Sequence, residues 1–394
     1  MYISLIEREL LIFSLHPRLH IFSMRFSTNT SSLKSAIDIV SHASSPGGMT
    51  PILENILIAV QYKKVVLTGN NLEMAIEVNL ENDVQIDAEG SFTVSSRFLT
   101  SFLSLVSDEK ISIELISGGA LEFTTPSSTT KVKGMEAAKF PVIPGFQVND
   151  PITLPAASLK KAIERTIFST AEGNIRPTLA GICLQLKDEG IIFASTDSFR
   201  LSEYVLKAKI DHPPMSMIIP AKTALELVRI LPESGDVSIY ASENQLLVVF
   251  GGIKVYSRLL NGHFPDYRNF FPKGYLTKGV VLRTNLIQAL KRMNLITKEN
   301  NYNTRVAFRA ESGLELFTGD TEIGAGRVMI PASVEGEDAT IGLNATYLLE
   351  VLSVMRDDHV SIDFETPLSP IMVQGIPAED AKQSYKHIIM PLKI

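Results

Sequence analysis

The chain has 394 residues, which is enough for several domains of ordinary size, and its 45% hydrophobic and 20% charged content is typical of globular proteins with well-formed cores. The net charge of −6, taken alone, argues weakly against nucleic acid as a partner. The single cysteine, Cys183, excludes an internal disulfide bond and fits a reducing cytoplasm. It lies in an apolar run, so we expect a buried core thiol and not a nucleophile.

Residues 1–23 precede the first repeated element. They are apolar, but Glu7, Arg8, Glu9 and Arg18 interrupt them, and the run at residues 10–15 is too short to span a bilayer. A signal peptide would begin with basic residues, not acidic ones. We therefore predict an extension outside the fold, with Met24 as the functional start; an appended helix is the alternative. No other stretch predicts a membrane span.

A helical phrase recurs three times along the chain. It reads SLKSAI at residues 32–37, SLKKAI at 158–163 and NLIQAL at 285–290, with leucines 126 and 127 residues apart. Solenoid units repeat every 20–50 residues or so, whereas this period has the size of a whole domain. The spacing predicts three similar domains and a pseudo-symmetric body, such as an arc or part of a ring.

Each repeat also contains a tight turn and a second helix. The turns follow strand-like runs that end in TGN at residues 68–70, STD at 195–197 and TGD at 318–320, and these residue types suit tight turns. Six helices are predicted, two per repeat, at residues 31–43, 95–106, 157–171, 220–231, 284–298 and 344–356. With about eight short antiparallel strands per repeat, the fold class is α+β, with two helices on antiparallel sheets in each domain.

The domain boundaries are predicted where Pro, Gly and polar residues gather. This gives an extension at residues 1–23 and three domains at residues 24–146, 151–272 and 273–394.

Positive charge collects on the predicted helices. Together they carry a formal charge of +7, so the rest of the chain carries −13. If the helices share one surface, that surface can hold phosphates through counterion release. The alternative is that lysine and arginine are simply good helix formers on solvated faces. These helices lack the aromatic platforms that single strands require, which favours contact with the backbone of a duplex.

Several motifs, taken in order, resemble the bacterial sliding clamp, the β subunit of DNA polymerase III. They are NLEM at residues 71–74, STDSFRL at 195–201, GHFPDYR at 262–268 and IMPLKI at 389–394. The resemblance covers residues 24–394. It implies a homodimer of three-domain chains that closes head to tail into a ring around double-stranded DNA, without sequence specificity. It also implies a bacterial, cytoplasmic, nucleoid-associated processivity factor.

The resemblance further implies a pocket for short linear motifs of the DNA polymerase III catalytic subunit, the clamp loader, other polymerases and repair proteins. The positions that match the family's pocket are apolar or aromatic with few polar anchors, as peptide anchors require. They are Leu179, Thr196, Ser198, Phe199, Arg200, Leu201, Pro265, Asn269, Phe270, Tyr302, Asn344, Tyr347, Pro370, Ile388, Ile389, Met390, Pro391 and Leu392. Core packing is the alternative for most of them.

Cationic residues are the candidates for DNA contact. The resemblance implies Arg97, Arg176 and Lys222, and charge with helix position adds Lys160, Lys161, Lys291 and Arg292. The chain departs from the family in several places. Ser198 and Phe199 stand where a Gly-His pair is common, Asn269 stands where many relatives carry arginine, and the loop at residues 45–49 lacks a basic residue.

No catalytic or metal-binding constellation is evident. The histidines are dispersed, the carboxylates do not form the cluster that two-metal chemistry needs, and no phosphate-binding glycine loop is present. We therefore predict no cofactor, no metal and no activity of the chain's own. Two alternatives remain open: an enzyme built on a triplicated scaffold, and a clamp relative that serves as a non-encircling interaction scaffold.

Overall fold

The computed structural model describes residues 24–393 except 45–49, 62, 81–82, 147–149, 174–175, 189, 208–211, 320–321 and 377–382. The predicted extension and the loop at residues 45–49 therefore lie outside the described residues. The chain forms two compact units, one of residues 1–156 with 230–259 and the other of residues 157–229 with 260–394. The central repeat thus contributes to both units.

The three repeats have similar element orders. The first contains β1 (Arg25–Asn29), α2 (Thr30–Ser41), β2 (Asn55–Gln61), β3 (Lys64–Asn70), β4 (Met74–Leu80), β5 (Gln85–Ala88), β6 (Gly90–Ser95), α3 (Ser96–Leu105), β7 (Lys110–Ile116), β8 (Ala120–Thr124), β9 (Thr129–Lys133) and β10 (Met135–Glu136). The second contains β11 (Ile152–Pro155), α4 (Ala156–Glu164), β12 (Gly181–Lys187), β13 (Gly190–Thr196), β14 (Arg200–Leu206), β15 (Met215–Pro220), α5 (Ala221–Ile230), β16 (Asp236–Ala241), β17 (Gln245–Phe250) and β18 (Ile253–Arg258). The third contains β19 (Thr277–Leu282), α6 (Arg283–Thr297), β20 (Asn303–Arg309), β21 (Gly313–Phe317), β22 (Arg327–Ile330), β23 (Ala332–Gly336), β24 (Ala339–Asn344), α7 (Ala345–Val354), β25 (His359–Phe364), β26 (Ile371–Ile376) and β27 (Gln383–Ile389).

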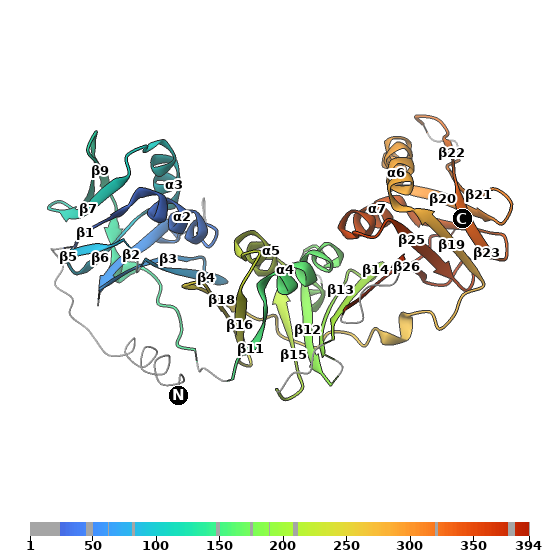
Figure 1. Cartoon of the computed structure of the whole chain (residues 1–394), viewed down its shortest axis with the longest axis horizontal. Helices are drawn as coiled ribbons and strands as arrows, with labels where there is room; N and C mark the ends of the chain where they lie inside the picture. The colour runs from blue at the N-terminus through green and yellow to red at the C-terminus, as the bar shows by residue number, and fades with distance from the viewer. Residues whose placement is uncertain are drawn as a thin grey trace. The chain divides into compact units, whose positions relative to one another are not determined.

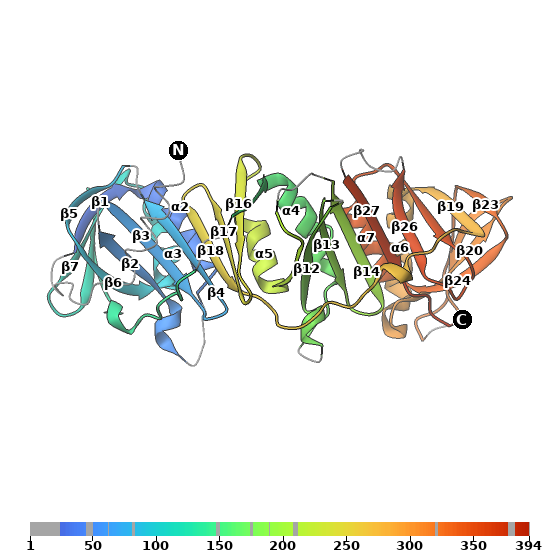
Figure 2. The same cartoon turned by 90° about the horizontal axis from the view of Figure 1, so that it is seen from below.

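Antiparallel sheets form the body of each unit, as predicted. The first unit holds a five-stranded sheet in the order β5-β1-β7-β8-β9 and a nine-stranded sheet in the order β10-β6-β2-β3-β4-β18-β17-β16-β11. The second holds a nine-stranded sheet, β15-β12-β13-β14-β27-β26-β25-β19-β23, and a four-stranded sheet, β22-β21-β20-β24. Main-chain pairing of β4 with β18, and of β14 with β27, joins successive repeats (Figure 2).

The repeated helical phrase places a buried leucine on the first helix of each repeat. Leu33 on α2, Leu159 on α4 and Leu286 on α6 are each at most 1% exposed. Helices α2 and α3 pack side by side in the first unit, and α6 and α7 do so in the second (Figure 1). Helices α3 and α7 begin at side-chain caps: the Ser95 hydroxyl accepts from the Phe98 amide, and the Asn344 side chain accepts from the amides that begin α7.

The prediction for α4 was wrong at its C-terminal end. The helix was expected to reach residue 171, but it ends at Glu164. The Thr166 hydroxyl donates to the Ala162 carbonyl at 2.8 Å, so a side chain competes with the helical ladder, and the chain then forms a 3-10 turn at Ile167–Ser169. Arg165, which was counted among the surface cations, is 2% exposed.

Arg165 packs between aromatic rings. Its guanidinium carbon lies 5.5 Å from the ring centre of Tyr204 and 5.1 Å from that of Tyr385. With Lys298 and Arg356 also outside the observed helices and Arg283 inside, the six helices carry +5, not +7. The helices remain the cationic part of an acidic chain.

Candidate binding site

A cavity of about 500 Å³ opens on the second unit. Four segments build it: the chain at residues 176–179, the turn between β13 and β14, the chain at residues 263–270, and the C-terminal end of β27. Apolar and polar side chains alternate around it. The residues that line it are Arg176, Thr178, Leu179, Thr196, Ser198, Arg200, Leu201, His263, Pro265, Tyr267, Phe270, Ile388 and Met390.

The turn between β13 and β14 is held by its own side chains. The Asp197 carboxylate accepts from the amides of Phe199 at 2.8 Å and Arg200 at 3.0 Å, and the Thr196 hydroxyl accepts from the Ser198 amide at 3.1 Å. Ser198 adopts a left-handed conformation with φ of 82°. The prediction of a structural turn role for Asp197 is thus confirmed. Among the described residues no group of three His, Cys, Asp or Glu side chains could hold a metal ion.

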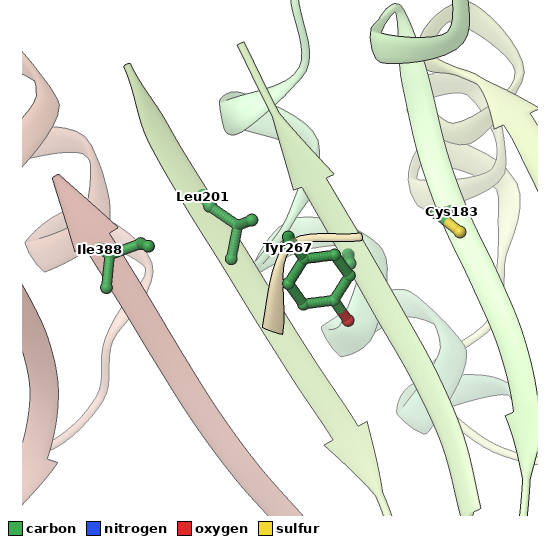
Figure 3. Close-up of a cluster of buried hydrophobic side chains, with 5 residues drawn as sticks. Cys183, Leu201, Tyr267 and Ile388 are labelled. Carbon is green, nitrogen blue, oxygen red and sulfur yellow. The ribbon is translucent and has the colours of Figure 1, made fainter. Parts of the chain in front are cut away.

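A buried apolar cluster forms the floor behind the cavity. Cys183, Ala194, Leu201, Tyr267 and Ile388 pack together, with the Leu201 and Ile388 side chains on neighbouring strands (Figure 3). Cys183 is buried as predicted, and burial raises the pKa of its thiol, so the group stays protonated.

Tyr267 anchors the segment that crosses this cluster. Its hydroxyl donates to the Glu203 carboxylate at 2.7 Å. Burial, followed by the charge of Glu203, raises the pKa of Tyr267 well above its ordinary value, so the phenol remains a donor at all physiological pH values. The edge of Tyr267 faces the rings of Phe264 and Phe271, which fixes the linker against the sheet.

Arg200 connects the cavity to three segments. Its guanidinium binds the carboxylate of Asp197 at 3.0 Å, the carboxylate of Glu350 on α7 and the carbonyl of Phe168. It also stacks on the ring of Tyr347, with its carbon 4.4 Å from the ring centre. Arg200 is 9% exposed. Because its donors already have partners within the protein, Arg200 sets the shape of the cavity wall.

The C-terminal residues are fixed by main-chain hydrogen bonds. Strand β27 pairs with β14, the Met390 amide donates to the Phe199 carbonyl at 2.8 Å, and the Leu392 amide donates to the Gly342 carbonyl at 2.8 Å. These bonds hold Met390 in place, at 36% exposure, as one wall of the cavity.

The structure brings half of the predicted pocket residues to the cavity wall. Nine line it: Leu179, Thr196, Ser198, Arg200, Leu201, Pro265, Phe270, Ile388 and Met390. Nine others lie outside its lining: Phe199, Asn269, Tyr302, Asn344, Tyr347, Pro370, Ile389, Pro391 and Leu392.

Several of these outer residues lie on the segments that build the cavity or at the start of α7. Phe199 is 60% exposed at the apex of the turn, and Ile389 is buried in the sheet. Asn344 caps α7, and Tyr302 accepts from the amide of Ala345 at the start of that helix. Sequence reasoning missed Arg176, Thr178, His263 and Tyr267 as lining residues, and Arg176 was predicted for DNA contact instead. The motif GHFPDYR, which contains His263 and Tyr267, was the signal that could have identified two of them.

The predicted DNA-contact residues fall into three groups. Arg97, Lys222, Lys291 and Arg292 are exposed on α3, α5 and α6. Lys160 and Lys161 are half-buried, and the Lys161 ammonium donates to Gln383 at 2.8 Å. Arg176 lies at the rim of the cavity, where it donates to the Ser198 hydroxyl. The structure thus ties Lys161 and Arg176 to the second unit's own side chains.

A histidine lies buried on β27, beside the pocket strands. His387 Nδ1 is 2.8 Å from the Ser202 hydroxyl, which is 2.8 Å from that of Ser169. Burial, followed by the charge of Arg200, lowers the pKa of His387 to about 3, compared with 6.5 for the free side chain.

This depressed pKa predicts a loss of stability in acid. Between pH 6.5 and 3 the unfolded chain binds a proton at residue 387 that the folded chain does not, so folding free energy is lost as pH falls, at about 1.4 kcal/mol per unit. We expect His387→Gln to reduce the drop in unfolding temperature between pH 7 and pH 5. Thermal unfolding at both values measures this drop. An unchanged drop in the variant would assign the acid sensitivity to other groups.

The chain is similar to known proteins over most of its length. Three family models match this chain. The N-terminal domain of the DNA polymerase III beta subunit matches residues 24–144, its central domain matches residues 153–266, and its C-terminal domain matches residues 268–393. The chain is 28% identical over 359 residues to the "Beta sliding clamp" of Staphylococcus epidermidis, covering 89% of this chain and 94% of that protein. The Staphylococcus aureus protein of the same name is 27% identical over the same shares of both chains.

Solved structures agree. The DNA polymerase III beta chain of Streptococcus pneumoniae aligns with a TM-score of 0.89 and 25% identity, over 94% of this chain and all of that one. The sliding clamp of Bacillus subtilis aligns with a TM-score of 0.87 and 25% identity, over 94% of this chain and 99% of that one. Among the described residues no helix is both long and apolar enough to cross a bilayer.

Proposed function

Because the chain belongs to the family of DNA polymerase III β subunits, the sliding clamps, we propose that two copies close head to tail into a ring around duplex DNA. The chain is a DNA sliding clamp, a processivity subunit without catalysis of its own. Such a subunit acts by topology: it replaces dissociation of the polymerase with a high effective concentration at the template. The cavity of the second unit is the observation that supports this function, because it offers a place to tether a partner.

The cationic helices supply the DNA-facing surface in this proposal. Lys291 and Arg292 on α6, with Arg97 on α3 and Lys222 on α5, are exposed and can neutralise phosphates without reading bases. A grip of this kind permits sliding, because every position along the duplex offers the same charges. The other candidates are Lys160 and Lys161, which are half-buried, and Arg176, which is exposed but bonded to Ser198.

Exposed leucines are our candidates for the ring interface. Leu105, which ends α3 in the first repeat, is 84% exposed, and Leu295 on α6 in the third repeat is 76% exposed. These two are the most exposed leucines among the described residues, and an apolar contact in the ring would remove them from water. A head-to-tail contact uses two different surfaces, one on each protomer, and these leucines lie on different repeats.

The pocket of the second unit is proposed to bind short linear motifs of the DNA polymerase III catalytic subunit, the clamp loader, other polymerases and repair proteins. The proposed domains are residues 24–146, 151–272 and 273–394, preceded by an extension at 1–23. We place the protein in the bacterial cytoplasm, associated with the nucleoid.

The ring predicts retention that depends on DNA topology. Loaded onto a nicked circular plasmid by a clamp loader, the protein should stay bound through gel filtration at moderate salt. Cutting the plasmid once should release it, because a ring slides off a free end. Equal retention on circular and linear DNA would favour the non-encircling scaffold instead.

Reversing two charges on α6 should weaken this retention. In Lys291→Glu with Arg292→Glu, two phosphate contacts become repulsive, so the half-life on circular DNA should fall at least about tenfold at low salt. Both side chains are exposed, so the unfolding temperature should change little. The matched control is Lys187→Glu with Lys207→Glu, which alters two cations outside the six helices. An identical loss in both variants would show that only net charge matters.

A further inference from the structure

A second, smaller cavity lies in the first unit. Its volume is about 90 Å³, roughly one-fifth of the volume of the pocket in the second unit. Its apolar lining residues include Leu72, Met74, Val142, Phe146 and Tyr256, and its charged lining residues are Glu73 and Arg258. Every lining residue belongs to the first unit.

This cavity occupies the place in the first repeat that the larger pocket occupies in the second. The Asn71 side chain accepts from the amides of Glu73 at 3.1 Å and Met74 at 2.8 Å, as Asp197 does in its own turn. The Asn70 side chain accepts from the Leu72 amide at 2.8 Å, which is the role of the Thr196 hydroxyl.

The correspondence extends to the strands and the buried polar pairs. Met74 on β4 pairs with Ser257 on β18, just as Arg200, 126 positions later on β14, pairs with Ile389 on β27. Glu77 lies 126 positions before Glu203, and each accepts a hydrogen bond from a tyrosine, Tyr256 at 3.1 Å in the first unit. The same framework therefore surrounds both cavities.

The backbone conformation and the exposure of Leu72 are unusual for a leucine. It adopts a left-handed conformation with φ of 73°, the position of Ser198 in the other turn, although a leucine is strained there. Its side chain is 51% exposed, and Val142 across the cavity is 88% exposed. A strained leucine beside an exposed valine keeps the mouth of the cavity apolar at a cost in stability.

One lining residue, Arg258, has a guanidinium that could bind an anionic ligand. Arg258 is exposed, and within the part of the chain that the structure describes no carboxylate pairs with its guanidinium. Its backbone amide donates to the Glu73 carbonyl at 3.0 Å, which fixes the residue at the turn. An arginine placed beside an apolar hollow suits a ligand that presents a carboxylate next to an aliphatic group.

We propose that this cavity is a second peptide-binding site, which takes one aliphatic side chain of an extended segment whose neighbouring carboxylate pairs with Arg258. Its volume suits a single side chain, whereas the pocket of the second unit has room for several. The proposal goes beyond the proposed function, because it does not require the larger pocket to be occupied.

Each cavity contains a methionine, which allows the two to be observed separately. The full-length protein labelled with ¹³C at methionine methyl groups would be titrated with N-acetyl-leucyl-aspartate amide, and the signals of Met74 and Met390 followed by NMR. We expect a saturable shift at Met74. The probe N-acetyl-leucyl-lysine amide should bind at least about tenfold more weakly, because its charge repels Arg258.

Two variants test the assignment. Leu72→Gly removes the apolar wall at a position whose φ suits glycine, so the fold should be retained or stabilised while the Met74 response weakens. Arg258→Gln should weaken binding of the acidic probe about tenfold and should strengthen binding of the lysine probe, because the repulsion by Arg258 is removed. An unchanged Met74 signal up to about 20 mM probe, a weak regime, would overturn the proposal, as would equal binding of the two probes. A shift at Met390 alone would also overturn it, while leaving the larger pocket's proposed function intact.

Discussion

Removal of residues 390–394 is expected to abolish stimulation of a replicative polymerase. The truncation takes away the Met390 wall of the large cavity and the hydrogen bond from the Met390 amide to the Phe199 carbonyl. A motif that packs there would lose its apolar contact with Met390 and the fixed wall that this residue provides. Together these losses should cost about 2–4 kcal/mol of binding free energy. Primer extension on a long circular template, measured with and without the truncated protein, tests this.

Two controls separate binding from folding. Strand β27 ends at Ile389, so the sheet should survive the truncation, and the dimer should persist in sedimentation. Met390→Asp keeps the chain length and the backbone hydrogen bond but places a charge in the cavity, so it should also abolish stimulation. Full stimulation by both proteins would place the tether elsewhere on the chain.

Replacement of Arg200 by alanine is expected to damage both stability and motif binding. Asp197 and Glu350 would lose their shared cation, and the Phe168 carbonyl and the Tyr347 ring would lose their contact. Removing one partner of a largely buried charge network costs about 3–5 kcal/mol. Thermal unfolding should begin at lower temperature, and fluorescence anisotropy with a polymerase-derived peptide should report weaker binding.

Two further substitutions show that the network causes the effect. Arg200→Lys keeps the charge but not the planar fork or the stacking on Tyr347, so it should recover only part of the loss. Arg229→Ala is the matched control: it also removes an arginine ion pair, with Glu226, but that arginine is 58% exposed, so it should cost less than about 1 kcal/mol. Equal losses in Arg200→Ala and Arg229→Ala would contradict a special role for the Arg200 network.

Local pattern accounts for what could be predicted. The phrase around Leu33, Leu159 and Leu286 correctly predicted that three helices exist, because each leucine is a buried packing position in the same place of its repeat. The caps at Ser95 and Asn344 are also local, because each side chain bonds amides only two or three positions ahead. Likewise, the turn after β13 is built by residues within four positions of one another.

The features that could not be predicted from the sequence depend on contacts between distant segments of the chain. The burial of Arg165 depends on Tyr204 and Tyr385, which lie far along the chain, so the residue resembled an ordinary helix cation in sequence. The place of Arg176 at the pocket rim follows from its bond to Ser198, across a turn that the sequence pattern does not position. The small cavity around Leu72 was not predicted for the same reason.

The pairing of β14 with β27 has a mechanical consequence. The pocket lies on a ladder of seven residue pairs, from Arg200 with Ile389 to Leu206 with Gln383. In the proposed function, a pull from a moving partner on a bound motif would reach the backbone of two successive repeats at once, and several hydrogen bonds would share the load. If the pocket binds the proposed motifs, we expect the side-chain contacts between motif and pocket wall to break before this ladder does. Partners would then detach and be exchanged one after another while the sheet beneath them stays closed.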